Sequence, residues 1–351
     1  MSRALDKDTT ATIKSGNLQV AYDDLVKALF SSTTSELLEI EILGKSHALP
    51  AGSNVLVDGN GIAFPKSTVL QGFIVARQIL FKYLPNLQER PQEVRNAAAV
   101  VLLMDPEHIT AANARKRVIE LYRLRPVEEL RAELMRELWW VDSMLTARLY
   151  RHTKSPTLWG HRRWVLQVCQ SVGMPYDMQR DLTTVILVAA ERHARNYYAW
   201  LHLRWVVLNL QSKTSDSGGG IAEGFDGSKL LSTVKTWCLR HQDDTAGFSF
   251  LLFCLVEHPE ALTGGESSIE NKSSICKALL DLAVSFKWTN ESVWAFLRAL
   301  VASGVTEEQR IAFFESIKVL AEARFGNAKA QSTLQAARDW CLANEMGVTR
   351  G

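Results

Sequence analysis

Two stretches of the chain decide its fold: KSPTLWGHRRW at residues 154–164 and RNYYAWLHLRW at residues 195–205. Trp, His, Arg and Trp recur in register between them, 41 residues apart. Weaker copies surround Ala112, Phe248 and Trp294, so the chain holds five units at spacings of 41 to 48 residues. This period exceeds the roughly 34 residues of a tetratricopeptide repeat and favours a larger helix–turn–helix unit.

Good helix N-cap residues stand four positions before the aromatic residue in the last four copies: Ser155, Asn196, Asp244 and Asn290. Their side-chain oxygens can accept the backbone N–H groups that a helix start leaves unbonded. Each copy is therefore predicted to open a helix with its aromatic one turn inside, on the buried face. Pro156 suits the first helical position, and Gly173 is predicted to end that helix.

The segment before the second copy carries apolar residues at steps of three or four, which predicts a partner helix: Leu130, Leu134, Leu138, Val141, Leu145 and Leu149. A hairpin with one apolar stripe cannot bury it alone, so successive hairpins must stack. We therefore predict an all-α fold, a right-handed α-α superhelix in the form of a crescent solenoid of helical hairpins.

Three regions follow from this pattern: an N-terminal helical cap with a mobile start (1–90), the hairpin repeats (91–300) and a C-terminal helical cap (301–351). Gly/Ser-rich text without periodicity predicts flexible insertions at 212–228 and 262–274. Within the N-terminal cap, two apolar runs near residues 55–64 flank a hairpin-like turn, which lacks the Lys-Ser/Thr of a phosphate-binding loop.

Composition narrows the class of protein. Lys plus Arg number 40 against 38 for Asp plus Glu, and the net charge of +2 argues against recruitment of nucleic acid. The five cysteines show no metal-ligand spacing, and no metal site is predicted on this chain. The start lacks the apolar core of a signal peptide, and no apolar run reaches membrane-spanning length. We expect a cytoplasmic protein with no membrane span.

The recurring side chains have structural interpretations. The repeat tryptophans are expected to fill the space between stacked hairpins. The repeat arginines are expected to bond carboxylates or helix ends of neighbouring repeats, with ligand binding as the alternative. The two repeat histidines have no metal-pairing neighbour and are expected to be packing residues. The residues with predicted structural roles are Trp159, Arg162, Arg163, Trp164, Trp200, His202, Arg204, Trp205, Trp294 and Arg298.

Positive charge is concentrated between Ser143 and Tyr176, where five Lys or Arg residues occur without any Asp or Glu. Either an anionic partner or carboxylates from the adjoining hairpins would explain it. Lys154 directly precedes the cap Ser155, at the positive end of a helix dipole, where a phosphate group can also bind. Arg195 holds the same place in the next repeat. A solvated loop lysine is the alternative interpretation of Lys154.

The motifs at residues 154–164 and 195–205 resemble the repeats of protein prenyltransferase α subunits, and the resemblance extends over about residues 91–300. It implies a crescent wrapped around a prenyltransferase β subunit, which holds the catalytic zinc and the isoprenoid pocket, so no cofactor is expected on this chain. It also implies that Lys154 is a catalytic residue directed towards the prenyl diphosphate. Further residues that it places near the diphosphate or substrate are His161, Arg195, Tyr197 and Tyr198.

Several positions depart from the family pattern. Ser155-Pro156 replaces the usual Asn-Tyr, and leucines replace a repeat arginine at Leu203, Leu251 and Leu297. These departures favour the divergent third type of enzyme, in which such an α subunit pairs with the Rab geranylgeranyltransferase β subunit. The implied substrate is a protein that already carries one lipid, such as a SNARE.

The sequence hypothesis is thus the α subunit of a heterodimeric protein geranylgeranyltransferase. The alternatives are a non-enzymatic α-solenoid scaffold and an orthodox α subunit shared by farnesyl and type I geranylgeranyl transferases.

Overall fold

The structure is a computed structural model. It describes residues 17–30, 36–44, 47, 49–50, 52–211, 226–259, 268–322 and 328–348. The chain forms two compact units, Met1–His202 and Leu203–Gly351, and their border falls inside helix α10 (Tyr197–Gln211). This division does not coincide with the borders predicted near residues 90 and 300.

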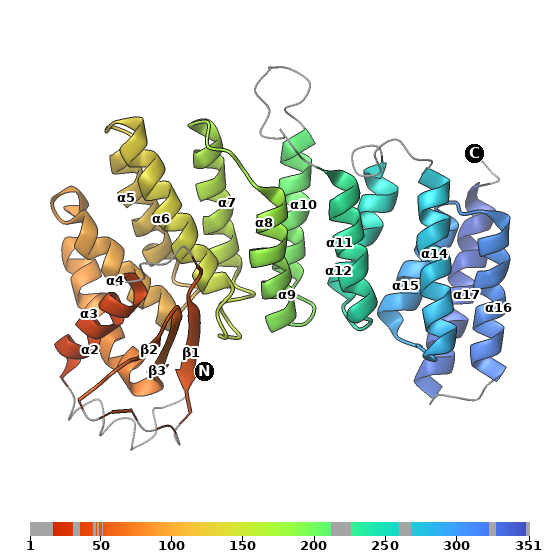
Figure 1. The fold of residues 1–351 in the computed structure, drawn as a ribbon, viewed down its shortest axis with the longest axis horizontal. Helices are drawn as coiled ribbons and strands as arrows, with labels where there is room; N and C mark the ends of the chain where they lie inside the picture. Colours follow the sequence, from red (N-terminus) through yellow and green to blue (C-terminus); the bar gives the residue numbers. More distant parts are fainter. Residues whose placement is uncertain are drawn as a thin grey trace. The chain divides into compact units, whose positions relative to one another are not determined.

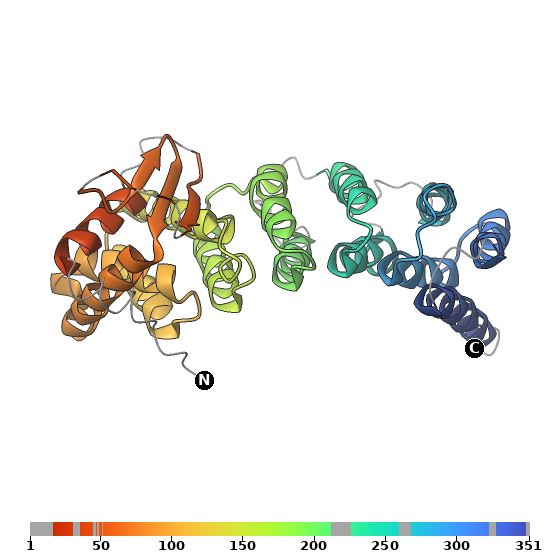
Figure 2. The ribbon, with the colours of Figure 1, turned by 90° about the horizontal axis from the view of Figure 1, so that it is seen from below.

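The first unit begins with helix α2 (Leu18–Phe30) and a small sheet of β1 (Glu39–Leu43), β2 (Leu56–Asp58) and β3 (Gly61–Pro65). The strands lie side by side (Figure 2), and their order in the sheet is β1-β3-β2. Strand β3 is parallel to β1 and antiparallel to β2.

The predicted turn near residues 55–64 is confirmed by the β2–β3 hairpin, whose Gly59 has a φ of 58°. The sheet itself differs from the predicted, purely helical cap. The alternation of buried and less buried residues along β3 explains the strand, because Ile62 and Phe64 lie on the buried face of the sheet. Part of the predicted mobile start, Leu18–Phe30, is helical, and residues 1–16 lie outside the described residues.

The rest of the first unit is helical, and its helices stand side by side (Figure 1). They are α3 (Lys66–Tyr83), a 3₁₀ turn (Leu87–Glu89), α4 (Pro91–Met104), α5 (Ile109–Tyr122), α6 (Val127–Leu145), α7 (Pro156–Ser171), α8 (Met178–Asp181), a π-helical turn (Leu182–Ile186), α9 (Leu187–Arg192) and the start of α10. Helix α5 packs on α6 and also on α7, so the helices form two layers.

The second unit repeats this plan. Its elements after α10 are α11 (Gly227–Arg240), α12 (Thr245–Leu252), a π-helical turn (Phe253–Glu257), α14 (Ser268–Ser285), α15 (Glu291–Ala302), α16 (Glu307–Glu322) and α17 (Ala328–Val348). Helix α12 packs on α15, and α15 on α17, while α14 packs on α16. The described part of the chain is thus predominantly helical and built from stacked hairpins, which confirms the predicted all-α solenoid class.

Both predicted insertions extend into helices. Helix α11 begins at Gly227 and α14 at Ser268, so residues 227–228 and 268–274 are helical. The remainder of these stretches, except Asp226, lies outside the described residues. The curvature and handedness of a superhelix stay predictions.

The helix starts lie where the capping pattern predicts them. The side-chain oxygens of Ser155, Asn196 and Asp244 accept backbone N–H groups three residues later, at 3.1, 3.3 and 2.8 Å. Asn290 stands at the N-cap position of α15 but makes no such bond with its side chain. In the first copy the cap is His108, whose Nδ1 accepts from the N–H of Ala111 at 3.2 Å.

Helix α7 ends as its sequence predicts. Gly173 has a φ of +67°, and the N–H of Met174 bonds the carbonyl of Cys169 at 3.0 Å. This bond closes the last turn in the manner of a Schellman motif.

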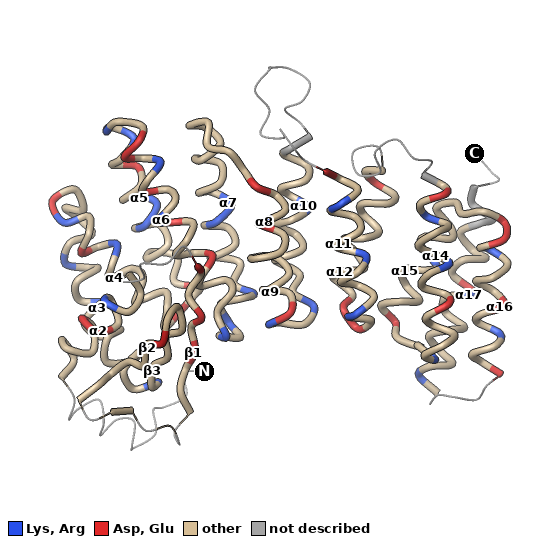
Figure 3. The backbone as a smooth tube through the Cα atoms, viewed as in Figure 1, with Lys and Arg blue, Asp and Glu red and all other residues tan. Residues whose placement is uncertain are grey.

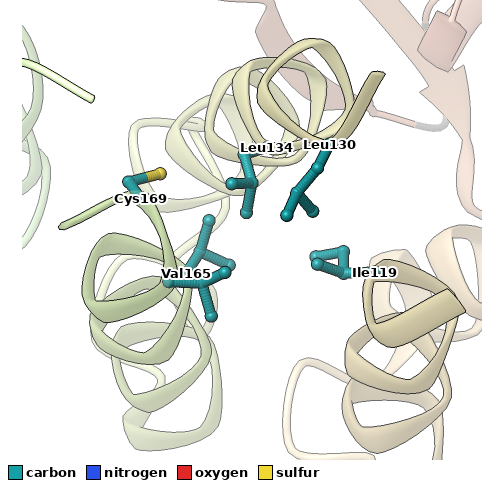
Figure 4. Close-up of a cluster of buried hydrophobic side chains, with 6 residues drawn as sticks. Ile119, Leu130, Leu134, Val165 and Cys169 are labelled. Atoms are coloured by element: carbon teal, nitrogen blue, oxygen red, sulfur yellow. The ribbon is translucent and has the colours of Figure 1, made fainter. Parts of the chain in front are cut away.

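A cluster of apolar side chains holds α5, α6 and α7 together (Figure 4). Leu130 and Leu134 of α6 face Ile119 of α5 and Val165 of α7, and all four are buried. The leucine spacing that predicted a partner helix therefore marks the buried side of α6.

Candidate functional site

A turn of ten residues, 146–155, joins α6 to α7 and carries Lys154. The turn is closed by backbone bonds from the N–H of His152 to the carbonyl of Leu149 at 2.9 Å and from the N–H of Ser155 to the carbonyl of His152 at 3.1 Å. The imidazole of His152 is buried and bonds the carbonyl of Leu102 in α4 at 3.0 Å. The backbone that presents Lys154 is therefore tightly fixed.

The carbonyl of Thr153, next to Lys154, accepts two hydrogen bonds. One comes from the indole Nε1 of Trp159 at 2.9 Å, and the other from the amide Nδ2 of Asn196 at 2.8 Å. Since Lys154 follows Thr153 and Arg195 precedes Asn196, the second bond brings the backbone of these two cationic positions together.

The same connection recurs along the repeats, always at the carbonyl six residues before the aromatic position. Ser155 Oγ donates to the carbonyl of Pro106 at 3.1 Å, and Ser292 Oγ donates to that of Gln242. Trp294 Nε1 donates to the carbonyl of Trp288 at 2.9 Å, as Trp159 does to Thr153. The bonds from Ser155, Asn196 and Ser292 thus link one repeat to the one before it, whereas each tryptophan bonds within its own repeat. The sequence predicted the caps and the aromatics but not these links between repeats.

Lys154 itself is half-buried, and its Nζ lies 4.5 Å from the centroid of the Tyr150 ring. Among the described residues, no carboxylate lies within ion-pair distance of Lys154. The Tyr150 ring is exposed and stands edge-on to the ring of His193, with centroids 4.2 Å apart.

Other cations in the acid-free stretch are paired with carboxylates from other elements. Arg148 lies 3.6 Å from Glu39 of β1, and Arg151 lies 3.0 Å from Asp105. Acidic and basic residues are accordingly interspersed along the backbone of the unit (Figure 3). Of the two explanations for the stretch, carboxylates from adjoining segments therefore account for these arginines.

Arg162 is buried and belongs to a second ionic cluster. Its guanidinium bonds Asp142 of α6 at 2.6 Å, Asp181 of α8, and the Nε2 of His202 at 2.7 Å. Burial lowers the pKa of His202 well below its ordinary value, and the neighbouring charges of Arg162 and Arg163 lower it further. A neutral His202 can accept the bond from Arg162, so both repeat residues hold α7 to its neighbours.

The N-terminus of α7 already has protein acceptors. Ser155 Oγ accepts from the N–H of Leu158, and the Thr157 hydroxyl donates to the Glu107 carboxylate at 2.7 Å. Glu107 thus brings negative charge to the helix end that was predicted to attract phosphate. The support for an anion site here therefore comes from the Lys154 side chain and not from the helix end.

His161 does not lie with Lys154 at the surface. Its side chain is fully buried, and its Nε2 lies 2.6 Å from the Glu137 carboxylate, which also pairs with Arg115 at 2.7 Å. The position differs from the predicted substrate-proximal one because the His161 side chain faces α6, where Glu137 lies. Burial lowers the pKa of His161, and the nearby Glu137 carboxylate opposes this shift only in part.

Arg115 was not singled out from the sequence. It stands three residues after Ala112, as Arg162 does after Trp159, and both guanidiniums are buried and paired. The leucines at the same place in later repeats, Leu203, Leu251 and Leu297, are also fully buried. At these positions a neutral apolar side chain thus occupies the buried place that Arg115 and Arg162 hold in the first two repeats.

The residues near the start of α10 lie at the surface. Arg195 is exposed with a φ of 58°, an uncommon conformation for a residue with a Cβ. Tyr197 is exposed, Tyr198 is half-buried, and their ring centroids lie 5.5 Å apart. The structure thus leaves Lys154, Arg195 and Tyr197 accessible near the bonded turns, and excludes His161 from them.

The remaining predicted structural residues contact their own units. Trp159, Trp200 and Trp294 are buried, whereas Arg163, Trp164 and Trp205 are half-buried. Arg204 lies over the Phe253 ring at 4.3 Å and 3.9 Å from Glu257. Arg298 lies over Trp340 at 5.3 Å and 3.9 Å from Glu291.

Neither metal ligation nor membrane insertion is evident in the described residues. No group of three or more His, Cys, Asp or Glu in them is arranged to hold a metal ion. None of the five cysteines forms a disulfide bond, and all five are buried. None of the described helices combines the length and the apolar character needed to span a bilayer.

Comparison with known proteins now gives the family context. A family model described as the ECM9 middle domain matches residues 158–279. Protein prenyltransferase alpha subunit repeat-containing protein 1-B of Xenopus laevis is 29% identical over 210 residues, which cover 54% of this chain and 39% of that protein. The sequence is similar to prenyltransferase α-subunit repeat proteins. The resemblance predicted from the motifs is thus confirmed.

Two further relatives carry the same name, protein prenyltransferase alpha subunit repeat-containing protein 1. That of Danio rerio is 29% identical over 43% of this chain and 35% of its own length. That of Homo sapiens is 28% identical over 46% of this chain and 40% of its own length. The chain thus spans about two fifths of the length of the prenyltransferase α-subunit repeat proteins that it matches.

Proposed function

We propose that this chain is the α subunit of a heterodimeric protein geranylgeranyltransferase and supports prenyl transfer to a protein cysteine. The names of its relatives and the stacked helical hairpins support an α-type repeat subunit. The observation that carries the catalytic part is Lys154, because its ammonium group is held in place without a neutralising carboxylate in the described part of the chain.

In this proposal Lys154 acts on the leaving group. Zinc, expected on the β partner, would favour the thiolate form of the substrate cysteine, and the sulfur of this cysteine forms the new bond to the prenyl C1. As the bond from the prenyl C1 to the diphosphate breaks, negative charge grows on the departing oxygen. An ammonium already fixed near that oxygen stabilises this charge without reorganising at the moment of reaction. The fixed turn at residues 146–155 serves that purpose.

The favoured partner is the β subunit of Rab geranylgeranyltransferase, with a lipid-bearing protein such as a SNARE as the substrate. The support is the loss of the usual Asn-Tyr after Lys154 and of the repeat arginine at Leu203, Leu251 and Leu297. These three leucines are fully buried.

A non-enzymatic helical scaffold is the second candidate. The observation that favours it is Glu107, whose carboxylate bonds Thr157 at the start of α7 and repels a diphosphate there. In this case the hairpins bind another protein, and Lys154 has no reacting partner. The third candidate is an orthodox α subunit of farnesyl or type I geranylgeranyl transferase. It differs from the proposed function only in the β subunit that it binds.

Co-purification separates these candidates. The full chain is expressed with each prenyltransferase β subunit in turn, and transfer of geranylgeranyl and farnesyl groups to protein is measured. We expect retention of the Rab-type β subunit and turnover of geranylgeranyl diphosphate. Absence of any β subunit from the purified material supports the scaffold instead, and farnesyl transfer supports the orthodox subunit.

The role of Lys154 is tested in the same complex. Lys154→Ala should lower the transfer rate about 100-fold while the heterodimer stays intact, because a fixed charge at the leaving group is lost. Lys277→Ala, at an exposed position of α14, is the matched control and should leave the rate unchanged. An undiminished rate for Lys154→Ala removes this residue from the site.

A further inference from the structure

We infer that Tyr150 is a positioning residue for Lys154: its aromatic face holds the ammonium group in place while leaving the positive charge available to an anionic ligand. The inference rests on the proposed diphosphate site and adds a residue to it. Its basis is the 4.5 Å separation of Lys154 Nζ from the centroid of the Tyr150 ring.

Tyr150 gains little from burial. Its side chain is 66% exposed although it lies in a turn fixed by neighbouring backbone bonds. The removal of apolar surface from water therefore does not explain an aromatic residue at this place. The contacts that do involve the ring are Lys154 over its face and His193 beside it.

The ring is itself oriented. His193 is buried, and its ring meets that of Tyr150 at 66° with centroids 4.2 Å apart, the edge-to-face geometry that aromatic pairs prefer. The backbone carbonyl of Tyr150 accepts from the Thr153 hydroxyl at 3.4 Å, which ties the tyrosine to the residue before Lys154. Tyr150 thus links a buried ring to an accessible cation.

An aromatic face and a carboxylate have different effects on a lysine. Both attract the ammonium group, but a carboxylate cancels its charge whereas the neutral ring does not. In the same turn Arg148 and Arg151 are paired with Glu39 and Asp105. Lys154 is thus held by a contact that preserves its attraction for a diphosphate.

The test compares Tyr150→Leu, which removes the ring, with Tyr150→Phe, which keeps it. Binding of inorganic pyrophosphate to the complex of the full chain with its β partner is measured by calorimetry. Because an exposed cation–π contact is lost, Tyr150→Leu should bind pyrophosphate with an affinity about two- to fivefold weaker. Tyr150→Phe should match the unsubstituted protein.

A double substitution shows whether Tyr150 acts through Lys154. In the Lys154→Ala background, Tyr150→Leu should have no further effect on affinity. Phe286→Leu in the second unit, where the aromatic is also 66% exposed, is the matched control and should leave affinity unchanged. Circular dichroism checks the fold, and Tyr150→Gln replaces Tyr150→Leu if the latter does not fold.

The outcomes separate the inference from the proposed function. If Lys154→Ala weakens pyrophosphate binding and Tyr150→Leu does not, the inference alone fails. The inference is also overturned if Tyr150→Leu weakens pyrophosphate affinity equally with and without Lys154. It is overturned as well if Tyr150→Phe weakens this affinity as much as Tyr150→Leu does. If the unsubstituted complex does not bind pyrophosphate, or Lys154→Ala leaves binding unchanged, the proposed site fails and the inference with it.

Discussion

His161 Nε2 lies 2.6 Å from Glu137 Oε1, and both side chains are fully buried between α6 and α7. Glu137 also accepts two bonds from the Arg115 guanidinium, at 2.7 and 2.8 Å. One carboxylate therefore joins three helices of the first unit. A buried arginine without its partner is costly, so the cluster depends on Glu137.

Glu137→Gln should lower the free energy of unfolding by about 3–5 kcal/mol, because the Arg115 charge is left buried without compensation. Urea unfolding followed by circular dichroism measures this loss. Glu128→Gln is the control on the same helix, since Glu128 is largely exposed and its ion pair with Arg131 contributes little. Equal effects of the two substitutions would contradict the role assigned to Glu137.

Acid should destabilise the protein in two steps. Burial lowers the pKa of His152 to about 4, so the folded state keeps it neutral while the unfolded chain protonates near pH 6.5. Stability present at neutral pH is therefore lost as the pH falls from 6.5 towards 4, by about 1.4 kcal/mol per pH unit for this residue. His161 and His202 act in the same direction.

The second step belongs to Glu137. Burial alone would raise its pKa, but the charge of Arg115 and the bonds from His161 and Arg115 outweigh this and lower the pKa to about 2. Its contribution is thus present above pH 4.5 and lost as the pH falls towards 2. Urea unfolding at a series of pH values tests both steps, and His152→Gln should reduce the slope between pH 6.5 and 4. An unchanged slope would show that His152 does not titrate in this range.

Trp200→Ala should cost about 3–5 kcal/mol in the free energy of unfolding, because it empties a buried position of the repeat core. Trp340→Ala is the comparison: this residue is 37% exposed, and its truncation should cost less than that of Trp200 because less apolar surface is removed from the core. Thermal and urea unfolding of both variants provide the comparison. Similar losses for the two tryptophans would count against Trp200 as a core residue.

Two glycines in and after α7 should respond in opposite directions to alanine. Gly173→Ala should destabilise the protein by about 1–2 kcal/mol, because the φ of +67° is unfavourable for a residue with a Cβ. Gly160 lies inside α7 with open space around an added Cβ, so Gly160→Ala should stabilise it by about 0.5–1 kcal/mol. Changes of the same sign would contradict this assignment.

The sequence predicted those features that depend on nearby residues. The caps at Ser155 and Asp244 and the glycine stop at Gly173 act over three to six residues, and the pattern of one helix is enough to find them. The buried tryptophans follow from the repeat itself. The hairpin turn before β3 was visible for the same reason.

The sheet and the charge pairs depend on contacts between distant residues. Strand β1 pairs in parallel with β3, with Glu39 opposite Gly61. The five residues of β1 do not predict which strand they pair with. Glu39 also bonds Arg192, 153 residues away, with both carboxylate oxygens. A count of charges along the chain could therefore show where positive charge gathers but not what compensates it.

For the candidate site, the sequence predicted the position of Lys154 but not its surroundings. The Tyr150 ring meets Lys154 because residues 146–155 fold back on themselves in a turn. No periodic pattern in the sequence predicts this turn. The family resemblance also implied His161 near the substrate, but its side chain is buried against Glu137 of α6, 24 residues away, a contact that no local pattern shows.

Glu39 has a practical consequence for anyone who shortens this protein. A truncated version that keeps only the helical hairpins, from residue 91 onwards, discards the carboxylate that faces Arg148 and Arg192. Arg148 and Arg192 would then lose this acidic partner, and we expect the fragment to bind polyanions such as heparin or DNA more strongly than the intact chain does. Such adhesion would be an artefact of trimming, and the intact chain is the proper material for binding studies.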